Sequence, residues 1–295
     1  MRTVLPEKRR GKLKKLIENQ KKIKAVEAVC GLEALAVTEA EKRSGNIFEA
    51  MWFSGLCCAA YKGMPDNEYV DFSDKLRDIE NIFAVSDKPL IADMDTGGTV
   101  PHFCMHICEL ERIGVSGVVA EDKTGLKQNS LYGSSVVHKM EDSEIFSEKI
   151  YQAKCSLISN EFMIFARTES LIAGESVEKA LERTEKYLKS GADGIVIHSI
   201  MKDGSDVFEF SSEFRKIHSN IPLVFIPTAY SSFSDDALFE KGANIVIYAN
   251  QLMRSAYQAM VRQTQFILDN KRTDESICEP VKKILNAIDG KDLKV

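Results

Sequence analysis

The sequence lacks any long apolar run: no stretch approaches the roughly eighteen consecutive apolar residues that a membrane-spanning helix needs. Its basic N-terminus is not followed by the apolar segment of a secretory signal. It also lacks the paired, closely spaced cysteines of a disulfide framework, because its seven cysteines are an odd number scattered over 295 residues. These absences predict a cytoplasmic protein with reduced thiols and no membrane partner.

The chain has no strong excess of either charge. It contains 39 basic and 44 acidic residues, which give a net charge of -5 at pH 7. A mildly acidic chain is a poor candidate for binding nucleic acid or an anionic membrane. One basic run, Lys8–Lys15, has no interleaved aromatic residues, and we expect it to form a solvated first helix. Hydrophobic residues make up 44% of the chain, which is enough for a sizeable core.

Short apolar runs alternate with amphipathic stretches along the whole chain. Most runs consist of β-branched or aromatic residues bounded by polar residues or glycine, a pattern typical of strands buried on both faces. Between them lie helical patterns such as Ser176–Ser190, in which Ser176 is suited to cap the helix and Gly191 to end it. The eight predicted strands are Ile23–Val29, Phe48–Trp52, Leu90–Ala92, Val118–Ala120, Met163–Ala166, Ile195–Ile197, Leu223–Ile226 and Ile245–Tyr248.

Eight strands separated by helices predict an α/β fold, a parallel (β/α)₈ TIM-type barrel that occupies residues 1–295 as a single domain. A doubly wound open sheet is the alternative, but it would usually carry a glycine-rich phosphate loop after its first strand. Neither a GxGxxG nor a Walker A pattern is present there. After the last strand, residues 251–295 continue as a helical C-terminal extension, which is longer than one barrel helix requires.

Polar side chains follow six consecutive predicted strands, where a (β/α)₈ barrel places its active site. Asp93, Asp95 and Glu121 form a thiol-free carboxylate cluster that suits Mg²⁺ or Mn²⁺, although the two aspartates could instead cap turns. Arg167 and His198 would add positive charge and donors, which suits a small phosphorylated carboxylate. The complete set is Asp93, Asp95, Glu121, Asp122, Lys123, Arg167, Glu169, His198, Ser199, Thr228, Tyr230 and Asn250.

A second group of metal-ligating residue types favours an ordinary packing helix over a zinc site. The group consists of His102, Cys104, His106 and Cys108. On a helix, the two histidines and the two cysteines form separate i, i+4 pairs on different faces. The surrounding segment, Phe103–Leu110, also has the pattern of a helix that packs against a core.

Several blocks of sequence give a more specific indication. The stretch Glu121–Ser130 resembles the EDK-x5-NS signature of the phosphoenolpyruvate mutase family, within the isocitrate lyase/phosphonomutase superfamily. The resemblance covers nearly the whole chain, and its blocks follow the family's order. The other blocks are Trp52–Leu56, Lys62–Asp66, Ala92–Gly97, Ala166–Gly174, Ile197–Ser199, Ile226–Tyr230 and Tyr248–Asn250.

The resemblance implies a Mg²⁺-dependent isomerase that converts phosphoenolpyruvate to phosphonopyruvate and so forms the P–C bond of natural phosphonates. It also implies a last helix exchanged between partner subunits, in a homotetramer of paired dimers, so that residues 251–295 pack against a partner. The implied reaction passes a phosphoryl group through a loose, metaphosphate-like state. Such a state needs positioning and cationic stabilisation more than it needs an acid or a base.

The same resemblance implies a role for individual residues. Asp93 would be the direct metal ligand, and Asp95 and Glu121 would hold the ion through water. A substrate cradle would be formed by Ser54 with the backbone amides of Gly55 and Leu56. The other implied roles are stabilisation of the moving phosphoryl group by Arg167 and His198, a mobile loop that carries Lys127 and Asn129, a catalytic carboxylate at Asp66 that acts as a nucleophile or electrostatically, and substrate contact by Trp52 and Ser130.

The chain departs from the family pattern at Cys30 and at Cys57–Cys58, near the expected rim of the pocket. It has Lys127–Ser130 in place of the K-[KR]-C-G-H loop of the superfamily's C–C lyases, which argues against isocitrate or methylisocitrate cleavage. Two alternatives stay open. One is a phosphonopyruvate hydrolase, which by the resemblance replaces Asn129. The other is a non-enzymatic barrel that binds a phosphorylated acid, although a binder need not retain the whole charged set.

Overall fold

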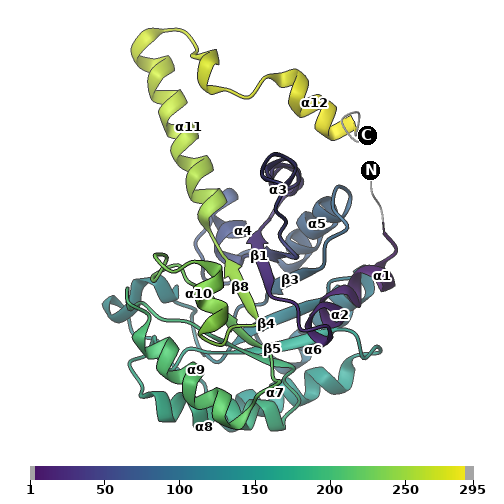
Figure 1. The fold of residues 1–295 in the computed structure, drawn as a ribbon, viewed down its shortest axis with the longest axis vertical. Helices are drawn as coiled ribbons and strands as arrows, with labels where there is room; N and C mark the ends of the chain where they lie inside the picture. The colour runs from purple at the N-terminus through teal and green to yellow at the C-terminus, as the bar shows by residue number, and fades with distance from the viewer. Residues whose placement is uncertain (1–3, 290–295) are drawn as a thin grey trace.

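The eight apolar runs form eight parallel strands that close into one barrel in the computed structural model, which describes residues 4–289 (Figure 1). Each strand pairs with its neighbours in chain order, and β1 closes the barrel by pairing Ile23 with Ile245 of β8. The predicted (β/α)₈ barrel is therefore confirmed. The strands are β1 Ile23–Glu27, β2 Ala50–Phe53, β3 Leu90–Asp93, β4 Gly117–Glu121, β5 Met163–Thr168, β6 Gly194–Ile197, β7 Leu223–Phe225 and β8 Ile245–Tyr248.

Helices surround the barrel, and α8 begins and ends where the sequence predicts. In α8, the Ser176 hydroxyl accepts from the Lys179 amide at the N-terminus, and Gly191 just beyond the C-terminus has a φ of 100°. None of the helices within residues 4–289 is both long enough and apolar enough to cross a membrane. The helices are α1 Pro6–Arg10, α2 Lys12–Glu18, α3 Gly31–Ser44, α4 Gly55–Tyr61, α5 Phe72–Phe83, α6 Val100–Ile113, α7 Ser143–Ser156, α8 Val177–Lys189, α9 Ser205–Ile217, α10 Asp235–Glu240, α11 Gln251–Asn270 and α12 Val281–Asp289, with 3₁₀ segments η1 Ser130–Ser135 and η2 Glu275–Ile277.

The inside of the barrel is a packed core that helix α2 closes at the amino ends of the strands. Leu13 of α2 is fully buried and belongs to the same apolar cluster as Ile23 and Ile245, the first residues of β1 and β8. The expectation of a solvated first helix is therefore wrong in part. The basic run is divided between α1 and α2, and Arg9 is only 3% exposed, with its guanidinium 3.7 Å from the centre of the Phe83 ring.

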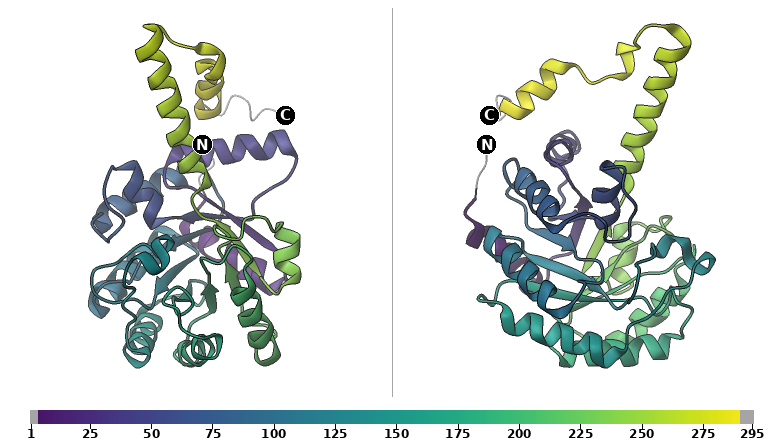
Figure 2. Two further views of the ribbon diagram at one scale, coloured as in Figure 1. Left: turned by 90° about the vertical axis from the view of Figure 1, so that its left-hand side faces the viewer. Right: turned by 180° about the vertical axis from the view of Figure 1, so that it is seen from behind.

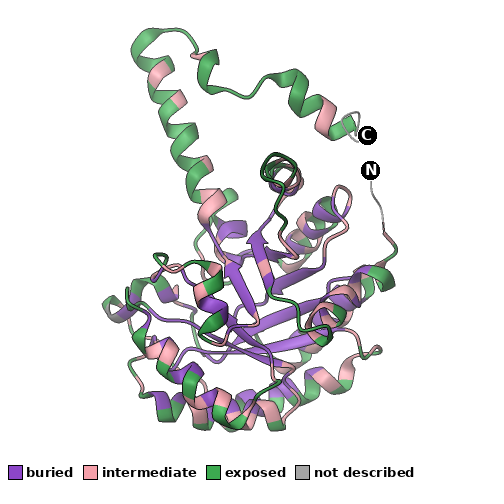
Figure 3. Ribbon diagram, viewed as in Figure 1, coloured by how far each residue is buried: buried purple, intermediate pink, exposed green. Residues whose placement is uncertain are grey.

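The C-terminal extension projects away from the barrel as α11, η2 and α12 (Figures 1 and 2). No residue of α11 or α12 is buried, and Figure 3 shows this arm as almost entirely exposed or half-buried. At its base, the buried carboxylate of Glu27 accepts from the backbone amides of Leu252 and Met253, both at 2.8 Å. This pair of bonds ties the first turn of α11 to the end of β1. Residues 290–295 of the predicted extension lie outside the described residues.

Replacing Leu13 with alanine tests the role of α2 as the closure of the barrel. Because Leu13 is fully buried, we expect Leu13→Ala to lower the free energy of unfolding by about 2–5 kcal/mol. Urea denaturation followed by circular dichroism measures this loss. The exposed Lys15 on the same helix provides the control, and Lys15→Ala should change stability by about 0.5 kcal/mol or less. Equal stability of the two variants would contradict this role for α2.

Candidate active site

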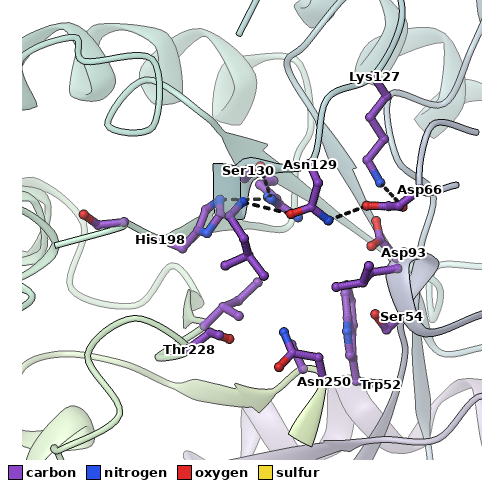
Figure 4. A pocket seen from close by; sticks show the side chains of 16 residues that line it. Trp52, Ser54, Asp66, Asp93, Lys127, Asn129, Ser130, His198, Thr228 and Asn250 are labelled. Atoms are coloured by element: carbon purple, nitrogen blue, oxygen red, sulfur yellow. Dashed lines mark hydrogen bonds and ion pairs between the residues drawn. The ribbon is translucent and has the colours of Figure 1, made fainter. Parts of the chain in front are cut away.

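A pocket opens at the carboxyl ends of the strands, and most of the predicted site residues line it (Figure 4). Among the residues for which the family resemblance implies a role, the exceptions are Gly55, Asp95 and Glu121, which lie beside the lining residues. Of the other strand-end residues, Asp122, Lys123, Glu169 and Tyr230 do not line the pocket. The predicted residues on the wall are Trp52, Ser54, Leu56, Asp66, Asp93, Lys127, Asn129, Ser130, Arg167 and His198. Ser199, Thr228 and Asn250, which follow β6, β7 and β8, also lie on the wall, together with Leu131, Ile226 and Ala249.

Asp93 ends β3 and Asp95 lies two residues beyond it, and the two carboxylates have different partners. Asp93 accepts from two backbone amides, those of Gly55 at 3.2 Å and of Asp95 at 3.1 Å. Asp95 instead accepts from two ammonium groups, Lys75 at 2.6 Å and Lys127. Burial and the neighbouring charge of Asp95 raise the pKa of Asp93. Burial opposes ionisation of Asp95 as well, but the two lysines lower its pKa below the usual value.

Glu121, the last residue of β4, is a buried carboxylate without a hydrogen bond. Its residue is 1% exposed, and neither side-chain oxygen has a hydrogen-bond partner. The nearest cations are the ammonium of Lys123 at 3.4 Å and the guanidinium of Arg167 at 3.5 Å. Burial and the nearby charge of Glu169, only partly offset by Arg167, raise the pKa of Glu121 to about 7. A buried carboxylate in this state is short of positive charge.

A network of buried side chains holds Arg167 and His198 on the opposite part of the wall. The Arg167 guanidinium donates to the hydroxyl of Ser130 at 3.0 Å and forms an ion pair with Glu169. The imidazole Nε2 of His198 lies 2.7 Å from Glu169 Oε1 and 2.9 Å from Arg167 Nη2. Lys123 completes the network by donating to Ser130 at 2.8 Å and by lying 3.2 Å from Glu169.

The buried groups of this network differ in their ionisation at neutral pH. Burial opposes ionisation of Glu169, but Arg167 and His198 hold its pKa well below the usual value, so it is ionised at neutral pH. Burial and the charge of Arg167 lower the pKa of His198. At neutral pH the His198 ring is therefore a neutral hydrogen-bonding group, and Arg167 supplies the positive charge. We expected both Arg167 and His198 to add positive charge, but in the structure only Arg167 does so at neutral pH.

Lys127 and Asn129 reach across the pocket mouth from the segment after β4 (Figure 4). The Lys127 ammonium donates to Asp66 Oδ1 at 2.9 Å, and the Asn129 amide donates to Asp66 Oδ2. The side-chain oxygen Oδ1 of Asn129 accepts from the Leu131 backbone amide and so caps the start of the 3₁₀ segment η1. Both side-chain oxygens of Asp66 thus accept hydrogen bonds from one loop. These two bonds hold the loop over the pocket that all three residues line.

Two residues of the predicted substrate cradle already form hydrogen bonds within the protein. The Ser54 hydroxyl accepts from the Cys57 amide at 3.2 Å, and the Gly55 amide donates to Asp93. A side chain at Gly55 would collide with Asp95, since an added Cβ would lie 2.7 Å from its Oδ1. Trp52 is 1% exposed, and its indole N–H has no partner although it lines the pocket. This donor is available to a bound oxygen atom.

Sequence reasoning misplaced some residues and missed others. Tyr230 packs in the hydrophobic core near Phe208 and does not line the pocket. Asp122 pairs with Arg183 and so supports the wall from outside the barrel. Glu169 follows β5 and was among the strand-end residues, but its central role needed the geometry. Lys75 lies on the amphipathic helix α5, and no sequence signal distinguishes it from a solvated lysine.

The four residues of the zinc alternative all lie on α6, and the ring of His106 stacks on Phe72 with 3.8 Å between centres. Across residues 4–289, no three His, Cys, Asp or Glu side chains are already gathered into a metal-binding set. Asp93 and Glu121 nevertheless fit a divalent cation, because both are buried carboxylates with hard oxygen ligands and neither oxygen of Glu121 has a hydrogen-bond partner. Water and substrate oxygens would have to complete the coordination of such an ion.

Comparison with known proteins agrees with this geometry. The profile of the phosphoenolpyruvate phosphomutase family matches residues 13–268. A phosphoenolpyruvate phosphomutase from Tetrahymena pyriformis is 31% identical over 273 residues, which cover 92% of this chain and 86% of the relative.

Two solved structures are also similar. A phosphoenolpyruvate phosphomutase from Streptomyces platensis subsp. rosaceus has a TM-score of 0.86, with 28% identity and coverage of 96% of both chains. A phosphonopyruvate hydrolase in complex with oxalate and Mg²⁺ has a TM-score of 0.85, with 27% identity and coverage of 99% of this chain and 97% of that one. These similarities and the strand-end site lead to one conclusion: the chain belongs to the phosphoenolpyruvate phosphomutase family.

Proposed function

We propose that this protein is a phosphoenolpyruvate mutase, an isomerase that converts phosphoenolpyruvate to phosphonopyruvate for phosphonate biosynthesis. The observation that carries the proposal is the loop over the pocket, in which Asn129 and Lys127 both bind Asp66. Asn129 supplies an amide at this point, and an amide can hold an intermediate without activating water. The buried pair of Arg167 and His198 supports the handling of a phosphoryl group.

The substrate would bind between two differently charged walls. Ser54, the Leu56 amide and the unpartnered indole N–H of Trp52 would bind the carboxylate and bridging oxygens at one side. Arg167 and His198 would bind the phosphoryl oxygens at the other side. Asp93, Asp95 and Glu121 would hold Mg²⁺, for which Mn²⁺ could substitute. When bound, the ion would supply Lewis-acid stabilisation of negative charge.

The reaction moves one phosphoryl group within one molecule. The bond between phosphorus and the enol oxygen breaks, and its electron pair stays on the oxygen of a pyruvate enolate. Arg167 stabilises the charge on the phosphoryl oxygens during this step, and the neutral His198 donates a hydrogen bond. The methylene carbon of the enolate then attacks phosphorus and forms the P–C bond. No net proton transfer is needed, so the site requires positioning and charge more than a base.

Water must be excluded while the phosphoryl group is between the two atoms. We propose that Asp66 serves as the latch of the loop and not as a nucleophile, because both of its oxygens accept from Lys127 and Asn129. Lys127 also contacts Asp95, so the closed loop joins the pocket mouth to the carboxylate cluster. Closure of this kind keeps the intermediate from becoming pyruvate and phosphate.

Phosphonopyruvate hydrolase is the second candidate, because a solved hydrolase covers 99% of this chain with a TM-score of 0.85. Its reaction uses the same bond cleavage but passes the phosphoryl group to water. The two candidates therefore differ in what the loop admits, and the identity of residue 129 favours the mutase. Binding without catalysis is the weakest candidate, since a scaffold has no need of a buried carboxylate such as Glu121, whose two oxygens have no hydrogen-bond partner.

The arm formed by α11 and α12 supports an assembly of the kind implied by the family resemblance. Large apolar side chains are exposed on it, including Leu268, Val281 and Leu285 at 70%, 70% and 53%. We propose that residues 251–295 pack against a second copy of the chain, and that two such helix-exchanged dimers form a homotetramer. All seven cysteines are unpaired thiols, which supports a cytoplasmic location.

Phosphorus NMR with phosphonopyruvate and Mg²⁺ tests the mutase proposal. The wild-type protein should produce phosphoenolpyruvate with little inorganic phosphate, because the closed loop excludes water. Asn129→Ala should lose at least about 10²-fold in mutase rate, as expected when a preorganised donor is removed, and should gain phosphate release. Stoichiometric phosphate and pyruvate from the wild type would assign the protein to the hydrolase instead.

Removal of the metal tests the carboxylate cluster. EDTA should abolish turnover, and Mg²⁺ or Mn²⁺ should restore it. Asp93→Ala should lose most of its turnover while its unfolding transition persists, because Asp93 lies at a strand end and binds only two backbone amides. Asp193→Ala is the matched control, since Asp193 pairs with Lys154 just before β6, at the other end of the barrel. Full activity of Asp93→Ala in excess chelator would refute the metal site.

A further inference from the structure

Lys75 is a buried lysine that reaches the carboxylate cluster from helix α5, outside the barrel. It is 9% exposed, and its ammonium lies 2.6 Å from Asp95 Oδ2. The other oxygen of Asp95 accepts from Lys127. Lys75 and Asp95 also line a separate cavity next to Met94 and His106, distinct from the pocket that Asp93 lines. The pair therefore lies behind the wall of the active-site pocket.

The two lysines on Asp95 differ in their freedom to leave it. Lys127 belongs to the loop over the pocket and divides its ammonium between Asp95 and Asp66. Lys75 belongs to a twelve-residue helix packed on the barrel, and Asp95 is its hydrogen-bond partner. Opening of the loop would remove Lys127 but would leave Lys75 in place. Asp95 consequently keeps one counter-charge whatever the loop does.

Asp93 lies only two residues away but forms no such ion pair within residues 4–289, although the charges of Lys127, Arg167 and Lys75 still favour its ionised form. Its two hydrogen bonds come from neutral backbone amides. The two carboxylates of Asp93-Met-Asp95 thus offer different amounts of negative charge to a cation. Asp95 offers an oriented oxygen whose charge is largely cancelled by two ammonium groups, and Asp93 offers an oxygen whose hydrogen bonds come from backbone amides. This asymmetry is built into the fold by α5 and is independent of any ligand.

We propose that Lys75 is a positioning residue that fixes Asp95 and weakens the affinity of the substrate-free site for a divalent cation. The inference rests on the metal site of the proposed function. A fixed positive charge within a few ångströms of a bound cation repels it, and in a buried site this repulsion is only partly screened. Because of Lys75, tight binding of the cation requires the additional negative charge of the bound substrate.

The binding of Mn²⁺ alone, measured by the loss of its free-ion EPR signal, tests this proposal without any turnover. Lys75→Met keeps an unbranched apolar chain but removes the charge, and it should bind Mn²⁺ about tenfold more tightly than the wild type. Lys75→Arg keeps the charge and should bind Mn²⁺ as the wild type does. Lys149→Met is the matched control, because buried Lys149 donates to the Thr96 carbonyl and pairs with neither aspartate.

A purely structural role for Lys75 predicts no gain in Mn²⁺ affinity when its charge is removed. If Lys75 only held the fold together, Lys75→Met would bind Mn²⁺ no more tightly than the wild type, and that outcome would overturn the proposal. If Lys75→Met does not fold, two other variants are compared instead: the single variant Asp95→Asn and the double variant Lys75→Met/Asp95→Asn. The double variant should bind Mn²⁺ more tightly than Asp95→Asn alone, because its buried ammonium is gone, and equal affinity would again overturn the proposal.

The metal site and the role of Lys75 can fail separately in this experiment. Asp93→Ala in the wild-type background should abolish Mn²⁺ binding. If it does and Lys75→Met changes nothing, the role of Lys75 is refuted and the metal site stands. If the wild type and Asp93→Ala bind Mn²⁺ alike, the metal site of the proposed function is itself refuted.

Discussion

Burial of negative charge at the carboxyl ends of the strands is the constraint on which the site depends. Asp93, Asp95, Glu121 and Glu169 are all less than one-tenth exposed, and each would be costly to ionise alone. Glu169 meets this cost with Arg167, and Asp95 meets it with Lys75 and Lys127. Asp93 accepts only from two backbone amides, and Glu121 has Lys123 and Arg167 at 3.4 and 3.5 Å but no hydrogen bond to either of its side-chain oxygens. The deficit of positive charge is therefore concentrated on the two carboxylates that a cation and its substrate could reach.

The barrel creates this arrangement from residues far apart in the sequence. Parallel strands align their carboxyl ends, so residues after β3, β4, β5 and β6 converge without any local motif. The apolar runs predicted all eight strands because β-branched and aromatic residues fill the barrel and its outer layer. Polar residues at the strand ends predicted most of the pocket for the same reason, since the strand period and topology determine where they point.

What the sequence could not reveal depends on side-chain direction and on helices. Tyr230 follows β7 as Thr228 does, yet its ring turns into the core beside Phe208, and only packing decides between the two. Lys75 is one of many lysines on amphipathic helices, and its burial depends on α5 lying against the turn after β3. Glu27 lies within the predicted strand Ile23–Val29, and no sequence signal indicates that its carboxylate binds the first turn of α11. Oxygen atoms such as those of Glu121 become informative only when their missing partners are seen.

The central claim is that a closed, dry pocket passes a phosphoryl group between two atoms of one substrate. Turnover of phosphonopyruvate in ¹⁸O-enriched water, followed by the isotope shift in phosphorus NMR, tests this claim most directly. We expect phosphoenolpyruvate whose three non-bridging phosphoryl oxygens all come from the substrate, because Asn129, Lys127 and Asp66 close the pocket. Inorganic phosphate that carries one solvent ¹⁸O, formed together with pyruvate as the main product, would contradict it.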